Sequence, residues 1–310
     1  MEKIVILGSG PAGLTAALYL ARAQLRPLLV GGSEPGGQLT ITSDVENYPG
    51  FPEGIQGPDL MERFRKQAER FGTRIRDGSV TAVDLSGSPR RITIEGGETI
   101  ECEALVVATG ASAQWLGLES ETALRGMGVS SCATCDGFFF MGKELIVVGG
   151  GDTALEDALY LTHFATQITV VHRRDALRAS RYMQEKALAH EKIGFAWNSV
   201  VDEIRDPARR QVTGVVLRDV KTGAKREVPC DGVFVAIGHR PNTQLFRGQL
   251  EMDPVGYLRT RPASTRTDRV GVFAAGDVAD PRYRQAISAA GSGCMAAIDA
   301  ERFLGGEPWE

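Results

Sequence analysis

Two stretches of the chain show the same succession of an apolar run and a glycine-rich turn. Residues 4–13 read IVILGSGPAG, and residues 145–154 read LIVVGGGDTA. An apolar run that ends at glycines predicts a strand entering a tight turn. Each turn is followed by an ALYL run, at 17–20 and 158–161, and then by a second β-rich run, LLV or ITVV. The pattern predicts two βαβ units that repeat one structural device.

Each predicted unit also ends with a similar apolar run. LVVATG at 105–110 closes the first and VFVAIG at 233–238 closes the second, whereas VFAAGD at 272–277 has no counterpart in the second copy. We therefore predict an α/β protein with two Rossmann-like dinucleotide-binding domains, the second inserted into a discontinuous first one. The predicted domains are residues 1–116 with 246–310, and residues 117–245.

A glycine turn between strand and helix has the chemistry to bind a dinucleotide. The first glycine permits a tight bend, the second lets the backbone approach a pyrophosphate, and the third position lets the helix pack closely on the strand. The free N–H groups of the helix then face the phosphates. A turn without a ligand could show the same glycines, but two copies in register favour binding. The predicted contacts are Gly8, Gly10, Pro11, Ala12 and Gly13 in the first copy, and Gly149, Gly151, Asp152, Thr153 and Ala154 in the second.

The residues after the second β-rich run indicate which nucleotide binds in each copy. The second copy continues into HRRDALR, which places guanidinium groups where the 2′-phosphate of NADPH would lie. A solvated basic turn is the alternative. The predicted NADPH contacts are His172, Arg173, Arg174 and Arg178, with Ile237 and Gly238 at the end of the closing run.

The first copy has Gly31 in place of His172 and no arginine nearby. FAD, whose ribose carries no phosphate, fits this position better than NADP. Glu34 is predicted to accept a hydrogen bond from the ribose, although a surface-loop glutamate is an equal alternative. The flavin arm is expected to run along Gly36, Gly37, Gln38, Leu39, Asn47, Gly276 and Asp277.

Composition restricts the class of protein. With 43% hydrophobic residues, 24% charged residues and a net charge of -4, the chain is predicted to be globular and to bind no nucleic acid. No apolar run approaches the roughly 20 residues of a membrane span, and the N-terminus lacks the basic segment of a signal peptide. Five cysteines are an odd number for a secreted disulfide framework. We therefore expect a cytoplasmic enzyme.

Two of the cysteines form a CATC motif, at Cys132 and Cys135. A two-residue spacer forms a small, reducible disulfide ring, which suits catalysis. Structural zinc would need four ligands, and neither a second CxxC nor an HxxxH is present, so no metal site is predicted. An inert pair of buried thiols is the other alternative. We expect Cys102, Cys230 and Cys294 to be unreactive, with Cys294 a small core residue.

The residues after CATC carry two further hypotheses. Asp136 is the candidate acid/base for the thiol proton, with a plain Asp-Gly turn as the alternative. Phe138, Phe139 and Phe140 cannot all point to one side of a strand, so at least one is predicted to contact a protein partner. Burial of all three is the alternative.

The order and spacing of the motifs resemble those of bacterial-type, low-molecular-weight thioredoxin reductases. Glutathione and lipoamide reductases carry instead a CxxxxC pair soon after the first glycine motif, and residues 34–60 here contain no cysteine. Flavin ferredoxin reductases lack CxxC. The resemblance covers nearly the whole chain and rests on GSGPAG, GGQL, VENYPG, CATCDG, GGGDTALE, HRR, AIGH, AAGDV and YRQAISAAGSGCMAA.

This resemblance implies a homodimer that passes electrons from NADPH through FAD to the Cys132–Cys135 disulfide and then to thioredoxin. It implies that Cys135 faces the flavin, that Cys132 attacks the partner, and that Asp277 holds the ribityl hydroxyls. A redox-sensing flavin module without turnover, or a reductase of another disulfide protein such as a peroxidase domain, remain alternatives. The further FAD contacts that it implies are Val80, Ala108, Thr109, Gly110, Arg284, Gln285 and Ala286.

Overall fold

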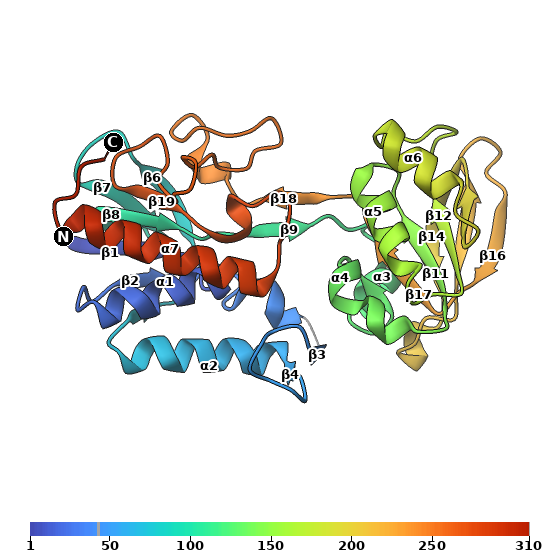
Figure 1. Ribbon diagram of the computed structural model, residues 1–310, viewed down its shortest axis with the longest axis horizontal. Helices are drawn as coiled ribbons and strands as arrows, with labels where there is room; N and C mark the ends of the chain where they lie inside the picture. The colour runs from blue at the N-terminus through green and yellow to red at the C-terminus, as the bar shows by residue number, and fades with distance from the viewer. Residues whose placement is uncertain (42–43, 310) are drawn as a thin grey trace. The chain divides into compact units, whose positions relative to one another are not determined.

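The computed structural model describes residues 1–41 and 44–309 (Figure 1). It divides into two compact units, each treated separately below. The two-segment unit comprises Met1–Ser112 and Arg240–Glu310, and the inserted unit comprises Ala113–His239. The predicted domain boundaries, at 116/117 and 245/246, fall a few residues after these positions.

Two crossing segments link the units and pair as a two-stranded sheet, β9 (Ala111–Ala113) with β18 (His239–Pro241). Asn242 fixes the end of this ribbon in the two-segment unit. Its side-chain Nδ2 donates to the carbonyl oxygen of Thr109 at 2.9 Å, and its own carbonyl accepts from the Thr109 hydroxyl at 2.7 Å.

The two-segment unit is built on a seven-stranded sheet. Its parallel part has the order β5-β2-β1-β8, with β19 beside the C-terminal half of β8, while β7 and β6 continue the sheet in antiparallel fashion. The strands are β1 (Glu2–Leu7), β2 (Leu28–Val30), β5 (Arg74–Arg76), β6 (Val80–Asp84), β7 (Arg90–Ile94), β8 (Thr99–Val107) and β19 (Val272–Ala274). A separate antiparallel pair is formed by β3 (Asp44–Val45) and β4 (Ile55–Gln56).

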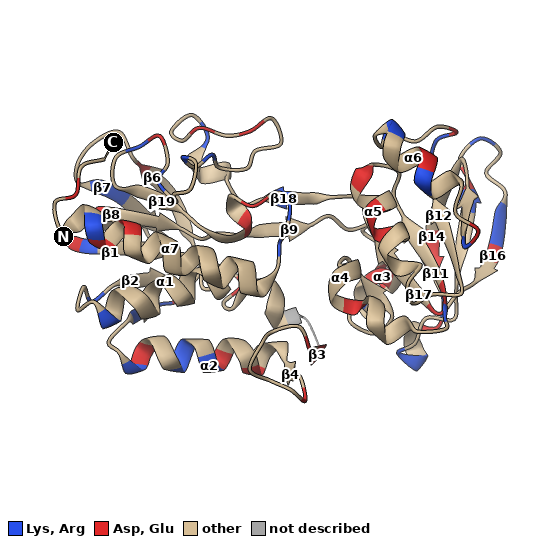
Figure 2. Cartoon of the chain, in the orientation of Figure 1, with Lys and Arg blue, Asp and Glu red and all other residues tan. Residues whose placement is uncertain are grey.

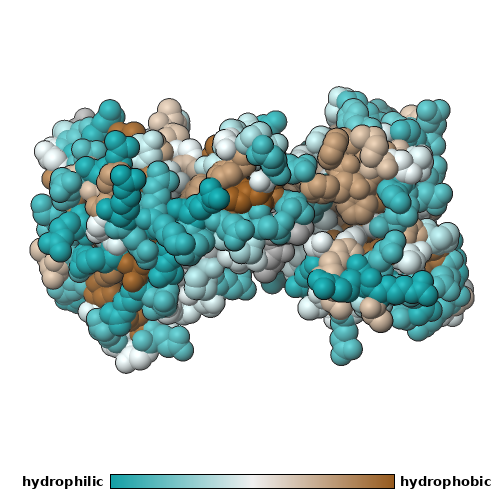
Figure 3. Space-filling model, turned by 90° about the horizontal axis from the view of Figure 1, so that it is seen from below, coloured by the Kyte–Doolittle hydropathy of each residue, from teal (hydrophilic) through white to brown (hydrophobic). Residues whose placement is uncertain are grey.

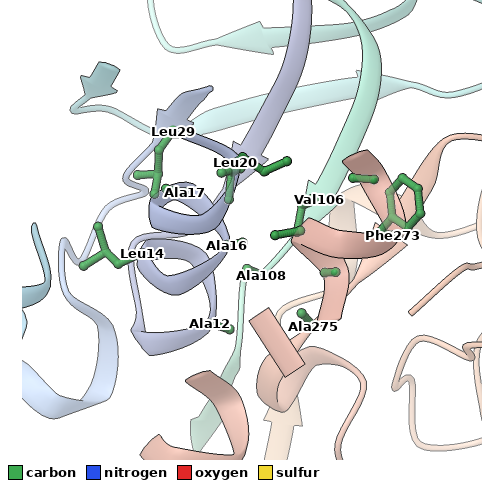
Figure 4. Packing of buried hydrophobic residues seen from close by; sticks show 14 of the residues in the cluster. Ala12, Leu14, Ala16, Ala17, Leu20, Leu29, Val106, Ala108, Phe273 and Ala275 are labelled. Atoms are coloured by element: carbon green, nitrogen blue, oxygen red, sulfur yellow. The ribbon is translucent and has the colours of Figure 1, made fainter. Parts of the chain in front are cut away.

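Side chains on successive residues of the central strands enter two different cores, because a strand alternates its side chains between two faces. Ile4 and Ile6 belong to one buried cluster, and Val5 and Leu7 to the other. Figure 4 shows the first cluster, in which Ala12, Ala16 and Leu20 of α1 face Val106 of β8 and Phe273 of β19. The helices of this unit are α1 (Pro11–Arg22), α2 (Gly57–Arg70) and α7 (Ala286–Leu304), with short 3-10 turns at Gly37–Ile41, Gln244–Phe246 and Gly276–Val278.

A glycine lets α7 approach the start of α1. A β-carbon on Gly293 would lie 2.1 Å from the carbonyl oxygen of Ala12, far inside van der Waals contact. Pro11 occupies the first turn of α1, where its missing N–H costs nothing. The first glycine turn is thus held between β8 and α7.

The inserted unit repeats this plan with an all-parallel sheet of order β10-β17-β11-β12-β13. The predicted repeat is confirmed, because β1-α1-β2 and β11-α5-β12 are both parallel βαβ units and β8 and β17 pair with the first strand of each. The elements are α3 (Glu119–Leu124), β10 (Val129–Ser130), α4 (Ala133–Asp136), β11 (Glu144–Val148), α5 (Asp152–Leu161), β12 (Gln167–Val171), α6 (Arg181–Leu188), β13 (Ile193–Ala196) and β17 (Gly232–Val235).

An antiparallel sheet of β14 (Ser199–Ile204), β15 (Gly214–Asp219) and β16 (Lys225–Pro229) completes the inserted unit. Its 3-10 turns lie at Gly137–Phe140 and Pro207–Arg209. As in the other unit, both faces of the central strand are buried, with Leu145 and Val147 in one cluster and Ile146 and Val148 in the other.

The surface carries mixed charge. Figure 2 shows acidic and basic residues interspersed on both units, for example along α2. The face drawn in Figure 3 is mainly hydrophilic on each unit, with apolar surface confined to limited areas. Across the described ranges, 1–41 and 44–309, no helix combines the length and apolar character that a bilayer span requires.

Candidate active site

The first glycine turn leaves no room for side chains at two of its three glycines. Gly8 has φ +106°, and a β-carbon there would lie 2.2 Å from the carbonyl oxygen of Ala108. A β-carbon on Gly13 would lie 1.9 Å from the carbonyl oxygen of Gly8. Gly10 differs, since no heavy atom of the described residues comes within 4 Å of its β-carbon position. Gly8 and Gly13 are therefore packed against backbone atoms, whereas the space beside Gly10 is free.

The second turn follows the same plan. Gly149 has φ +154°, and a β-carbon there would lie 2.5 Å from the carbonyl oxygen of Ala236. Gly151, like Gly10, faces space that the described residues leave free within 4 Å. Ala154 occupies the third position and is fully buried.

Both turns have the donor set that a pyrophosphate needs. Gly10 and Gly151 are the N-cap residues of α1 and α5, and within the described part of the chain neither helix start receives a side-chain capping bond. The first N–H groups of an α-helix have no partner within the helix. Here the described residues also leave the space beside Gly10 and Gly151 unfilled within 4 Å. Because these groups carry partial positive charge, the arrangement fits an anionic dinucleotide in each unit.

Ser9 joins the first turn to the GGQL segment, and sequence reasoning missed it. Its buried hydroxyl donates to the carbonyl oxygen of Gly31 at 2.8 Å and accepts from the Gly36 N–H at 3.0 Å. A β-carbon on Gly37 would lie 3.5 Å from Cα of Gly10. The only signal in the sequence was a serine between two glycines, which does not specify a partner.

Other predicted FAD residues of the two-segment unit also come together. The Asn47 Nδ2 donates to Oε1 of Gln285 at 3.4 Å, although these residues are far apart in sequence. Gln285 in turn caps α7 through a reciprocal capping box with Ser288. Glu34 is exposed, whereas Gln38, Leu39 and Val80 are half-buried.

Asp277 lies beside the start of α1. Gly276, with φ +76°, precedes it, and a β-carbon there would lie 2.8 Å from Cβ of Ala12. Burial raises the pKa of the Asp277 carboxyl to about 6; repulsion from Asp280 adds to the rise, and the positive charge of Arg284 opposes it. A half-buried carboxyl near the open turn is suited to accept hydrogen bonds from ligand hydroxyls.

His172 and the arginines that follow it lie in different environments. His172 is only 5% exposed and packs on the second turn, where a β-carbon on Gly150 would lie 2.2 Å from its Nδ1. Its Nε2 lies 3.1 Å from the carbonyl oxygen of Ala176, and burial lowers its pKa. Arg173, Arg174 and Arg178 are exposed. The geometry gives His172 a packing contact with the turn and leaves the guanidinium groups accessible.

The segment that carries these arginines is tied to the second turn. The N–H of Arg178 donates to the carbonyl oxygen of Gly150 at 2.7 Å. Asp152, at the start of α5, accepts from the Ser180 N–H at 2.8 Å, and this bond lowers the pKa of its carboxyl. Gly238, with φ +106°, lies just after the closing strand β17, and Ile237 beside it is exposed.

Cys132 and Cys135 form a disulfide, with a Cα–Cα distance of 5.3 Å. Cys132 is the N-cap of the short helix α4, which ends at Asp136. Burial raises the pKa of the Asp136 carboxyl, and a hydrogen bond from Ser130 opposes the rise. This carboxyl is a half-buried group adjoining a cysteine, and not the side chain of an exposed turn.

The three phenylalanines lie in a 3-10 turn and not in a strand. Phe138 is 60% exposed and Phe139 is 45% exposed, so the alternative that all three are buried is wrong. Phe140 points inward, with its ring 5.2 Å from that of Phe234. Phe138 packs edge-on against Phe164 at 6.4 Å between ring centroids. Two aromatic rings are therefore exposed within a few residues of the disulfide.

The remaining cysteines differ from one another. Cys102 and Cys230 are buried, and burial raises the pKa of each thiol to about 12, which makes them unreactive. The expectation that Cys294 is a core residue is wrong: it is half-buried, because its position on α7 places it near Tyr19, which is itself exposed. Nowhere among residues 1–41 and 44–309 do three His, Cys, Asp or Glu side chains gather as metal ligands would.

Comparison with known proteins agrees with this architecture. Residues 2–293 match the family model of pyridine nucleotide-disulphide oxidoreductases. A thioredoxin reductase of Streptomyces clavuligerus is 54% identical over 305 residues, which cover 98% of this chain and 94% of that protein. A thioredoxin reductase of Rickettsia conorii is 54% identical over 303 residues, covering 97% and 98%.

The fold is also similar to that of solved thioredoxin reductase structures. The thioredoxin reductase of Giardia duodenalis superposes with a TM-score of 0.92 at 44% identity, and that of Streptococcus pyogenes with a TM-score of 0.92 at 39% identity. Each match covers 98% of both chains. With two open glycine turns, a CATC disulfide and a family model that matches almost its whole length, the chain belongs to the pyridine nucleotide-disulphide oxidoreductase family.

Proposed function

We propose that the protein is an NADPH-dependent, FAD-containing reductase that passes electrons through Cys132–Cys135 to the disulfide of oxidised thioredoxin. The observation that carries the proposal is the redox-capable disulfide in the same unit as an open dinucleotide turn flanked by exposed arginines. The relatives at 54% identity are thioredoxin reductases, which supports thioredoxin as the substrate.

FAD is assigned to the two-segment unit, which contains every FAD contact predicted from the sequence. Gly10 leaves room for the pyrophosphate, and the exposed Glu34 is available to the adenosine ribose. When bound, FAD accepts a hydride from NADPH and supplies two electrons for disulfide reduction. Asp277 would accept hydrogen bonds from the ribityl hydroxyls.

NADPH is assigned to the inserted unit, which contains Gly151 and the exposed arginines. Arg173, Arg174 and Arg178 would bind the 2′-phosphate, because guanidinium groups form charge-assisted bonds with phosphate oxygens. His172, being buried with a lowered pKa, would support the turn and not bind the phosphate as a cation.

The disulfide and Asp136 carry out the thiol chemistry. Two electrons break the Sγ–Sγ bond, the carboxyl of Asp136 gives its proton to Cys135 Sγ, and Cys132 Sγ remains a thiolate. This thiolate attacks the partner's disulfide to form a mixed disulfide. Cys135 Sγ, after returning its proton to Asp136, then attacks Cys132 Sγ and releases the reduced partner.

Phe138 and Phe139 give the protein partner an apolar contact beside the disulfide, since exposed aromatic rings are frequent anchors at interfaces. A homodimer and a cytoplasmic location complete the proposal. The first rests on the resemblance and the second on the odd cysteine number and the reducible pair.

Steady-state oxidation of NADPH in the presence of oxidised thioredoxin tests this function. An enzyme consumes NADPH continuously until thioredoxin is reduced. A redox sensor would consume about one equivalent per protein and stop, and a reductase of another disulfide protein would respond to that protein and not to thioredoxin.

Replacing Arg173 or Arg174 with alanine is expected to weaken NADPH binding by roughly 10- to 100-fold, the factor for losing one bond to a charged group. NADH binding should change little, because NADH lacks the 2′-phosphate. Arg181→Ala is the matched control, since Arg181 is exposed nearby and pairs with Glu185. Equal losses for NADPH and NADH, measured as dissociation constants, would refute the phosphate assignment.

The affinity for FAD is expected to rise with pH between about pH 5 and about pH 7, because the free Asp277 has a pKa of about 6 and must lose its proton to accept fully from hydroxyls. Ligand hydroxyls that donate to the carboxylate favour the ionised form, so binding releases a proton. Asp277→Asn should weaken FAD binding at high pH and remove this pH dependence. Fluorescence titration of the FAD-free protein measures both, and an unchanged slope in the variant would disprove the role of Asp277.

A further inference from the structure

The hydroxyl of Thr134 lies against the sulfur of Cys132, with Oγ1 3.4 Å from Sγ. Of the two residues between the cysteines, Ala133 is 1% exposed and Thr134 faces solvent. Because a sulfur atom in a disulfide carries no proton, the hydroxyl is the donor of this hydrogen bond. The bond joins a side chain that the proposed thiol chemistry does not use to one of the two reacting sulfur atoms.

The backbone around Cys132 is fixed on both sides. The Cys132 N–H donates to Ser130 Oγ at 3.0 Å, and the Cys132 carbonyl oxygen accepts from the Asp136 N–H at 3.1 Å. Ser130 is itself only 7% exposed, and Thr134 lies within α4, the helix that begins directly after Cys132. Neither backbone bond involves a sulfur atom. We therefore expect the Thr134 hydroxyl to stay beside Cys132 Sγ when the Sγ–Sγ bond opens.

Opening the disulfide makes the hydrogen bond to Cys132 Sγ stronger. A neutral sulfur is a weak acceptor, whereas a thiolate carries a full negative charge and takes part in charge-assisted hydrogen bonds. A hydroxyl that donates to the charged form of a group favours its ionisation. Since the thiolate and not the thiol is the nucleophile in disulfide exchange, this hydrogen bond increases the fraction of Cys132 that can react at neutral pH.

We propose that the Thr134 hydroxyl stabilises the thiolate of Cys132 in the reduced protein and so keeps it ready to attack the disulfide of a partner. This inference rests on the proposed function and adds a residue to it. Asp136 transfers the proton, and Thr134 stabilises the negative charge that remains on Cys132 Sγ. The threonine keeps its own proton throughout, so the bonds that form and break are those of the thiol–disulfide exchange described above.

Thr134→Val removes the hydroxyl and keeps the shape of the side chain. In the FAD-loaded protein reduced with dithiothreitol, this variant should react with iodoacetamide at Cys132 roughly 5-fold more slowly at neutral pH. The loss is smaller than that of a buried hydrogen bond to a charged group, because Thr134 is exposed and water replaces part of the bond. Peptide mass spectrometry after timed quenching distinguishes alkylated Cys132 from alkylated Cys135.

The pH profile of alkylation distinguishes a lost hydrogen bond from general damage to the motif. Without the hydroxyl, the midpoint of the profile should move to higher pH. Above the midpoint, Thr134→Val should react at least as fast as the unmutated protein, since a less stabilised thiolate is the better nucleophile. An unchanged profile, or a rate lowered by the same factor at every pH, would overturn the proposal.

Two further variants serve as controls. Thr134→Ser keeps a hydroxyl and should restore the unmutated profile; if it behaved like Thr134→Val, the hydroxyl would not be the group responsible. Thr166→Val removes another exposed hydroxyl of the inserted unit, which donates to the carbonyl oxygen of Lys143 at 3.0 Å, and should leave alkylation of Cys132 unchanged. Alkylation requires neither NADPH nor thioredoxin, so a wrong substrate assignment would be recognised in the turnover assay independently of the result for Thr134.

Discussion

Replacing Cys132 with serine is expected to reduce the rate of protein disulfide reduction by at least about 10³-fold, while NADPH still bleaches the bound FAD. A serine hydroxyl can neither form the disulfide nor attack as a thiolate at neutral pH. Loss of a covalent nucleophile is among the largest single-residue effects in catalysis. Stopped-flow absorbance of the flavin follows the first half reaction, and thiol release from thioredoxin follows the second.

Cys294→Ser provides the control for that variant. Cys294 is a half-buried free cysteine and lies in the two-segment unit, on α7, so neither half reaction should change. If Cys132→Ser kept most of its thioredoxin-reducing activity, the Cys132–Cys135 pair would not be the relay.

Two glycine variants in the first turn should affect different properties of the protein: one the affinity for FAD, the other the stability of the fold. Gly10 has φ -71°, which alanine adopts readily, and its β-carbon would enter the free space assigned to the pyrophosphate. Gly10→Ala should therefore fold normally and lose at least about 10-fold in FAD affinity.

Gly13 lies within α1, where alanine is the better helix former, yet its β-carbon would overlap the Gly8 carbonyl oxygen. Gly13→Ala should destabilise the protein by about 3 kcal/mol or more.

Flavin content after purification and thermal unfolding of the FAD-free proteins separate these two effects. The second turn accommodates Ala154 at the equivalent position, with a different backbone angle at its first glycine, +154° at Gly149 compared with +106° at Gly8. Normal flavin content in Gly10→Ala would contradict the assignment of the open turn to FAD.

The repeated strand, turn and helix could be predicted from the sequence because their signals are local. An apolar run ending at Gly8 or Gly149 specifies a buried strand and a tight turn without reference to the rest of the chain. The disulfide was predictable for the same reason, since a two-residue spacer brings both sulfur atoms within one turn of chain.

Other features of the site depend on contacts between distant residues. No local pattern connects Asn47 with Gln285, or the Ser9 hydroxyl with Gly31 and Gly36. His172 belongs by sequence to a basic cluster, but its position directly after β12 turns its ring onto Gly150. Burial of a polar group is decided by the neighbouring elements and not by the adjacent letters.

The Phe138–Phe140 run shows the limit of periodicity in a short segment. A strand would alternate the three rings between two faces. The 3-10 turn that forms instead directs Phe140 into the core and leaves Phe138 and Phe139 exposed, a few residues after the disulfide. Turns of this length carry no repeating pattern, so the sequence predicted an exposed aromatic residue without identifying it.

Electron stoichiometry tests the central claim most directly. The FAD-loaded protein is mixed without oxygen with limiting NADPH and excess oxidised thioredoxin, and new thioredoxin thiols are counted against NADPH consumed. We predict two thiols for each NADPH, because disulfide reduction is a two-electron couple, and none with Cys132→Ser. Consumption of NADPH without the appearance of thioredoxin thiols, or equal thiol yield from Cys132→Ser, would contradict electron transfer through Cys132–Cys135.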